Sequence, residues 1–144
     1  MNTNTKTVPT WYWVVCTLLF LWNVMGVGSF FHHLFISPEA LSALPENEQL
    51  LYTQLPLWAK ITFAFAVFGG LLGCLALLLR KKWAVMLLQI SLLGVLIQMF
   101  HTLFISNIIE VYGPSAMVMP ILVIGIAFVL VWFSRFALKK SWLR

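Results

Sequence analysis

The sequence predicts an all-α fold, an integral membrane bundle of four antiparallel helices with a short amphipathic loop on the outer side. Hydrophobic residues make up 62% of its 144 residues and charged residues only 9%, whereas soluble domains carry roughly a quarter charged residues. The apolar residues also gather into four runs, each near the roughly 20 residues that a helix needs to cross a bilayer. This composition excludes a disordered chain and a disulfide-stabilised scaffold.

The four runs are the predicted membrane spans, and they cover residues 11–35, 57–79, 83–109 and 117–134. Only the second contains a charged side chain, Lys60. Lipid offers no hydrogen-bond partners to the backbone, so each span must be a helix. Together they leave no room for a soluble domain, and we expect one membrane domain over residues 1–144. A cleaved secretory signal is the alternative for the first run, which is longer and bulkier than such signals are.

The charged residues are sorted between the two sides of this arrangement. Eight of the nine Lys and Arg residues precede the first span, join spans two and three (Arg80, Lys81, Lys82), or follow the fourth. Lys60 and all four acidic residues lie on the other side; the acidic residues are Glu39, Glu46, Glu48 and Glu110. Basic loops stay in the cytoplasm, so both termini are predicted to be cytoplasmic. The net charge of +5 therefore reports topology, and we expect no nucleic-acid partner.

The connections carry recognisable turn and capping residues. Ser37 followed by Pro38 is typical of a helix start, and Pro45 can begin a second short helix. Residues 37–56 are thus predicted to form one or two short helices on the outer surface. Residues 80–82 leave space for only a tight hairpin, and Gly113-Pro114 indicates a turn before the fourth span.

Polar and small residues share one face of each of the first three spans, at about 100° per residue. In the third span these residues are Ser91, Gly94, Gln98, His101 and Thr102. In the first span they are Trp22, Gly26, Ser29 and His33, with Asn23 beside them. In the second span they are Thr62, Ala66, Gly69, Gly73 and Ala76. One interpretation is helix packing, because small residues let backbones approach and amides hydrogen-bond across helices.

The second interpretation is a binding site, since polar groups inside a membrane commonly serve function. We predict an outward-facing pocket for a small polar solute, lined by Asn23, His33, Gln98 and His101. Lys60 and Glu110 are secondary candidates: Lys60 either reaches the headgroups or pairs with a carboxylate. The alternative for the histidines is an interfacial, hydrogen-bonded role. Their spacing lacks a metal-ligand pattern, and no catalytic motif is visible, so neither an enzyme nor a metal or cofactor site is expected.

Several segments carry a resemblance to known proteins. They are Leu21-Trp22-Asn23, Met25-Gly26-Val27, Leu50-Leu51-Tyr52, Pro56-Leu57-Trp58-Ala59, residues 67–73, Arg80-Lys81-Lys82-Trp83 and Tyr112-Gly113-Pro114-Ser115. With them the chain resembles small four-span bacterial membrane proteins that are often labelled "sugar transporter" without an assigned mechanism. It is more distantly similar to the DoxX-like four-helix membrane families, through Pro56-x-Trp58 at the entry to a Gly-rich second span. The resemblance implies a bacterial inner-membrane protein, and it transfers no catalytic residue.

The leading functional hypothesis is therefore a small inner-membrane protein that binds or transports a small polar solute. One alternative is a non-enzymatic accessory or assembly subunit of a larger membrane complex. Another is a DoxX-like redox component, which would hold a quinone or haem. The expected partner in every case is the lipid bilayer, with a homo-oligomer or a larger membrane complex as further expectations.

Overall fold

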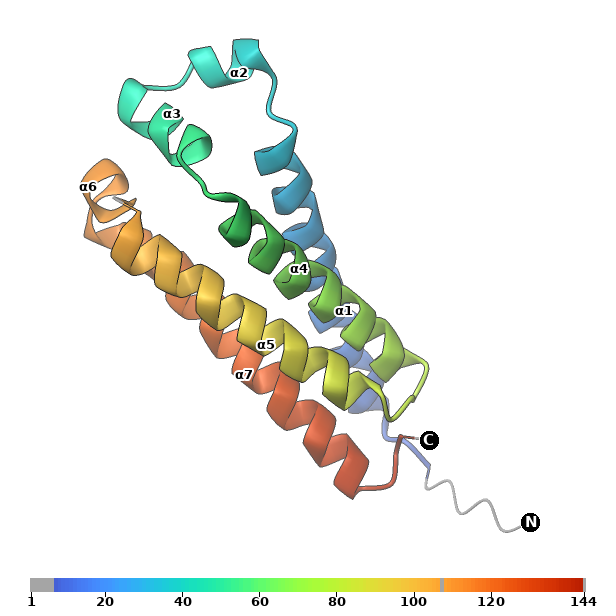
Figure 1. Cartoon of the computed structure of the whole chain (residues 1–144). Helices are drawn as coiled ribbons and strands as arrows, with labels where there is room; N and C mark the ends of the chain where they lie inside the picture. The colour runs from blue at the N-terminus through green and yellow to red at the C-terminus, as the bar shows by residue number, and fades with distance from the viewer. Residues whose placement is uncertain (1–6, 107, 144) are drawn as a thin grey trace.

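The computed structural model describes residues 7–106 and 108–143, and within them every regular element is helical (Figure 1). The long helices are α1 (Thr10–Leu34), α4 (Leu57–Leu78), α5 (Ala84–Phe100) and α7 (Val118–Lys139). The π-helical turn η1 (His101–Ile105) continues α5. Short elements complete the chain: α2 (Pro38–Ser42), α3 (Glu46–Thr53), α6 (Ile108–Tyr112) and the 3-10 turn η2 (Pro114–Met117). The predicted all-α four-helix bundle is confirmed.

Four segments are long and apolar enough to cross a membrane, namely Thr10–Leu34, Leu57–Leu78, Ala84–Ile105 and Pro114–Lys139. The third ends before the predicted residue 109, because Ser106 has an extended backbone and a separate short helix follows. The fourth runs beyond residue 134 as a helix through Arg135 to Lys139. Basic side chains suit the C-terminal end of a helix and can extend toward the headgroups.

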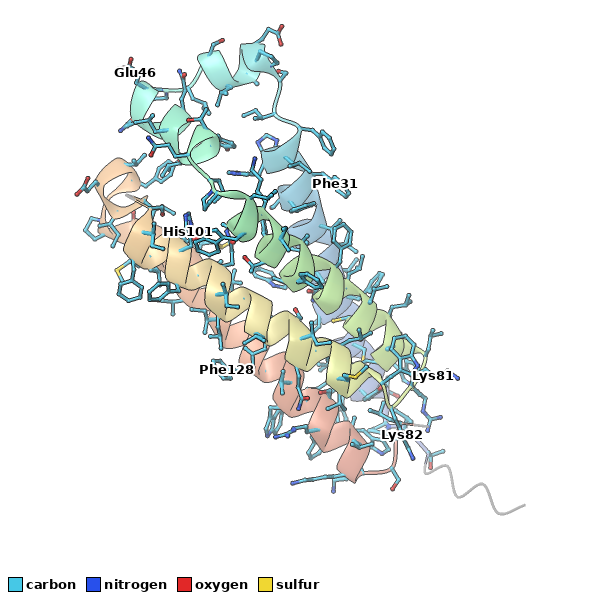
Figure 2. The ribbon with its side chains drawn as sticks, in the orientation of Figure 1. Phe31, Glu46, Lys81, Lys82, His101 and Phe128 are labelled. Atoms are coloured by element: carbon cyan, nitrogen blue, oxygen red, sulfur yellow. The ribbon has the colours of Figure 1, made fainter. Side chains whose placement is uncertain are left out.

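The two ends of the bundle carry opposite charge. We call the end with α2, α3 and α6 the acidic end, because Glu39, Glu46, Glu48 and Glu110 lie there. We call the other the basic end, since it holds the 80–82 hairpin and the last turn of α7. Figure 2 places Glu46 at one end and Lys81 and Lys82 at the other.

The loop at the acidic end folds as its capping residues predict. The Ser37 hydroxyl accepts a hydrogen bond from the Ala40 backbone N–H at 3.1 Å, and Pro38 is the first residue of α2. Pro45 directly precedes α3. Gly113, at φ 85°, makes the turn into η2 in the left-handed region that favours glycine. Of the one or two short helices predicted for residues 37–56, two are present, α2 and α3.

Helices α4 and α5 form a closely packed central hairpin. A Cβ atom at Gly94 would lie 3.0 Å from both the Ala66 backbone nitrogen and the Thr62 carbonyl oxygen. A Cβ atom at Gly73 would lie 2.5 Å from the Leu88 side chain. The small-residue face predicted for the second span thus serves helix packing. Helix α1 packs on α4, and α7 packs on α5.

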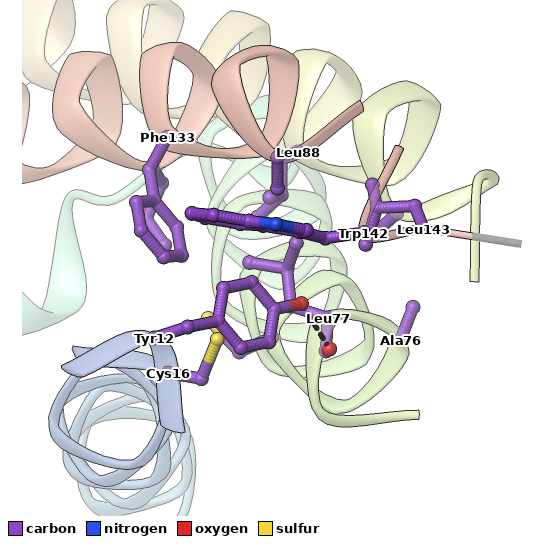
Figure 3. Packing of buried hydrophobic residues seen from close by; sticks show 12 residues of the cluster. Tyr12, Cys16, Ala76, Leu77, Leu88, Phe133, Trp142 and Leu143 are labelled. Atoms are coloured by element: carbon purple, nitrogen blue, oxygen red, sulfur yellow. Dashed lines mark hydrogen bonds between the residues drawn. The ribbon is translucent and has the colours of Figure 1, made fainter. Parts of the chain in front are cut away.

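Helices α1 and α7 meet through side chains at the basic end (Figure 3). The ring of Tyr12 stacks on Phe133 at a centroid distance of 5.5 Å, and Trp142 meets Tyr12 edge-on at 5.5 Å. The Tyr12 hydroxyl donates a hydrogen bond to the Leu77 carbonyl at 2.6 Å. Toward the acidic end the ribbon of α1 diverges from that of α7 (Figure 1).

The close approach at Gly94 predicts a packing penalty that Gly125 does not share. Replacing Gly94 with Val should destabilise the protein by about 1–3 kcal/mol, because rigid backbone atoms face the new side chain. Gly125→Val is the matched control, since nothing lies within 4 Å of that position. Thermal unfolding in detergent should show a lower Tm for Gly94→Val alone. An equal fall in both variants would contradict the packing argument.

Candidate functional site

A cavity of about 270 Å³ lies beneath α3 at the acidic end of the bundle. Three of the four predicted site residues line it: His33 from α1, Gln98 from α5 and His101 from η1. We call this space the histidine cavity. Tyr52, Thr102 and Ser106 contribute further polar groups, and Lys, Arg, Asp and Glu are absent from its lining among the described residues.

Both histidines are held by aromatic neighbours. The His33 ring stacks on Tyr52 with a centroid distance of 4.5 Å and an interplanar angle of 18°. The His101 ring meets Trp58 edge-on at 5.2 Å. His33 Nε2 and His101 Nδ1 are buried and have no hydrogen-bond partner among the described residues. A buried polar atom without a partner costs roughly 1–3 kcal/mol, so these nitrogens suit a molecule that brings its own hydroxyl or amide groups.

The π-helical turn shapes one wall of this cavity. The Ser106 backbone N–H reaches back to the His101 carbonyl at 2.8 Å. The Ser106 hydroxyl bonds to the Thr102 carbonyl at 2.5 Å, and the Thr102 hydroxyl bonds to the Gln98 carbonyl at 3.1 Å. Such turns within α-helices are frequent at functional sites. Sequence reasoning missed both the turn and Ser106, because a regular helical period does not reveal an added residue.

Gln98 lies where the histidine cavity adjoins a second space. The Thr62 hydroxyl donates to Gln98 Oε1 at 3.3 Å. Gln98, Phe63 and Met99 line both the histidine cavity and a cavity of about 260 Å³ between α1, α4, α5 and α7. We call this second space the lateral cavity. Gln98 is therefore the one predicted site residue shared by both.

Asn23 lines the lateral cavity and not the histidine cavity. Its Nδ2 donates to the Leu19 carbonyl at 2.8 Å and contacts Cys74 Sγ at 3.3 Å. Its Oδ1 packs so closely on Gly70 that no Cβ would fit there. The structure thus gives Asn23 a packing role and separates it from the two histidines.

The secondary candidates differ in position. Glu110 is exposed and lines a pocket of about 350 Å³ with His101, Leu51, Leu55 and Ser106, all four of which also line the histidine cavity. This pocket, the acidic-end pocket, thus adjoins the histidine cavity. Lys60 is half-buried on α4 and lines none of these cavities. Within the described residues there is no group of three or more His, Cys, Asp or Glu side chains that could hold a metal ion.

No family model, curated protein or solved structure matches this chain. The functional interpretation therefore rests on the geometry of the cavities.

The stack of His33 on Tyr52 predicts that Tyr52 fastens α3 over the histidine cavity. Aromatic pairs contribute about 0.5–1.5 kcal/mol, so Tyr52→Ala should speed hydrogen exchange of the α3 amides by roughly twofold to tenfold. Phe104→Ala is the control, because it also removes an aromatic ring, which is 74% exposed and pairs with Phe100 on α5. Unchanged exchange in Tyr52→Ala would show that the stack does not hold α3.

Proposed function

We propose that this multi-pass membrane protein binds a small, uncharged polar solute in the histidine cavity and moves it across the bilayer. One observation carries the proposal: two buried ring nitrogens without partners, His33 Nε2 and His101 Nδ1, belong to residues that line the same cavity. The adjoining acidic-end pocket, lined by the exposed Glu110, offers a route from the surface. The resemblance to proteins labelled sugar transporters supports the same class of solute.

The lining favours a neutral, hydroxylated molecule. Burying a charge without a partner is costly, and no Lys, Arg, Asp or Glu is among the described lining residues. Imidazole, amide and hydroxyl groups can each donate or accept hydrogen bonds, as Gln98, Thr102 and Ser106 would do with a polyol or sugar. Phe63 supplies an apolar surface on which the C–H groups of such a polyol or sugar can pack.

The charge distribution supports a location and an orientation. Basic segments remain in the cytoplasm, so the basic end would face the cytoplasm and the histidine cavity would open outward. The resemblance supports a bacterial inner membrane.

Uptake by proteoliposomes tests the solute proposal with glycerol, erythritol, xylose and glucose as probes. The wild type should take up at least one of them faster than empty vesicles. His33→Phe and His101→Phe keep an aromatic ring but remove the nitrogens, and should lower uptake to the empty-vesicle rate. His32→Phe is the matched control, because His32 is exposed and does not line the histidine cavity. A wild type no faster than empty vesicles, or fully active His33→Phe and His101→Phe variants, would refute the proposal.

Orientation is tested by single introduced cysteines. Both native cysteines, Cys16 and Cys74, are fully buried and should remain unlabelled. In intact cells, a membrane-impermeant maleimide should label Glu46→Cys at the acidic end. Lys81→Cys at the basic end should react only after permeabilisation. The reverse pattern would place the termini outside.

A further inference from the structure

Helices α1 and α7 both supply apolar residues to the wall of the lateral cavity. Helix α1 contributes Trp22, Met25 and Gly26, and α7 contributes Met119 and Val123. The exposed fractions of Met25 and Met119 are 66% and 56%. These two side chains lie on the apolar surface that membrane-spanning helices present to lipid. A molecule dissolved in the bilayer could therefore reach the cavity without crossing water.

The lateral cavity and the histidine cavity differ in whether their hydrogen-bonding groups have partners. Of the polar groups in the lateral cavity, the Asn23 amide nitrogen bonds to Leu19 and Cys74, and the Ser91 hydroxyl donates to the Ala66 carbonyl at 2.6 Å. These two groups thus find partners within the bundle. Gln98 stands at the junction, and the unpartnered histidine nitrogens lie beyond it. A ligand that extended from one cavity into the other would thus meet unpartnered hydrogen-bonding groups at its end in the histidine cavity.

The sizes of the two cavities also favour a ligand that occupies both. Each is about 260 or 270 Å³, slightly below the roughly 300–1,000 Å³ typical of small-molecule sites. Taken together they fall within that range. They share Phe63, Gln98 and Met99, so the two cavities adjoin at these three side chains.

The geometry points to an amphiphile as the ligand, with an uncharged, hydroxylated head in the histidine cavity and an apolar chain in the lateral cavity. This inference rests on the proposed function and names the class of molecule that carries the polar group. The chain lies between α1 and α7 and enters from the lipid. The head reaches His33 and His101 past Gln98.

Gly26 offers a way to block the chain without touching the head. A Cβ atom there would meet Val67 Cγ1 at 3.5 Å, which is an ordinary contact, and Gly26 itself lines the lateral cavity. Gly26→Leu should therefore fold and fill part of the cavity. Gly125→Leu on α7 is the matched control, because Gly125 is exposed with nothing within 4 Å. Val123→Trp narrows the same cavity from the α7 side.

The experiment uses the full chain in phosphatidylcholine nanodiscs that contain 1-acylglycerol with a photoreactive diazirine near the end of its chain. After irradiation, peptide mapping should find adducts concentrated on the cavity-lining residues of α1 and α7. Gly26→Leu and Val123→Trp should each reduce these adducts at least fivefold, and Gly125→Leu should not. Lysophosphatidylcholine with the same photoreactive chain carries a charged head, and should label lipid-facing residues evenly without this concentration.

Two results would overturn the inference that the ligand is an amphiphile. One is equal labelling in the Gly26→Leu, Val123→Trp and Gly125→Leu variants, each with wild-type helicity and Tm. The other is equal concentration of both probes on the cavity-lining residues. Uptake of the same four probe solutes, glycerol, erythritol, xylose and glucose, separates the inference from the proposed function. His101→Phe could abolish uptake while Gly26→Leu and Val123→Trp leave both uptake and adducts unchanged. That result would support the proposed solute site and refute the inference that the ligand is an amphiphile. If wild type shows neither uptake nor concentrated adducts, both fail.

Discussion

The hydrogen bond from the Tyr12 hydroxyl to the Leu77 carbonyl joins α1 to α4 at the basic end of the bundle. From this end α1 and α7 diverge (Figure 1). Tyr12 is fully buried, and its ring packs on Phe133 and Trp142. A hydroxyl removed from water needs a partner. The Leu77 carbonyl accepts this bond in addition to one from the Arg80 backbone N–H at 3.0 Å, which a carbonyl with two lone pairs can do. Arg80 adds a bond from its Nε to the Trp142 carbonyl at 2.7 Å. Helices α1, α4 and α7 are thereby joined at the basic end, and the cavities lie beyond this junction.

Polar groups inside the bundle divide into two classes according to their partners. Asn23 and Ser91 bond to neighbouring helices, and glycines opposite them allow close contact. His33 and His101 instead retain buried nitrogens without partners beside a cavity. The same residue types can therefore serve packing or binding, and the satisfaction of their hydrogen bonds distinguishes the two.

Local signals predicted much of this fold. The length of the apolar runs predicted the spans, and Ser37 and Pro45 predicted the short helices. Helical periodicity predicted that Ser91, Gln98 and His101 face the bundle interior, where they are buried. The π-helical turn and the divergence of α1 from α7 were not predicted, because both depend on tertiary packing. The grouping of Asn23 with His33 neglected axial rise: ten residues at about 1.5 Å each separate them by roughly 15 Å along one helix.

The packing of Tyr12 on Phe133 joins α1 to α7 at the basic end, and the two helices diverge from there (Figure 1). From Tyr12 to Leu34, roughly 33 Å at about 1.5 Å per residue, α1 is supported by its packing on α4. The exposed side chains of Met25 on α1 and Met119 on α7 also line the lateral cavity, so lipid acyl chains would contact the rim of that cavity directly.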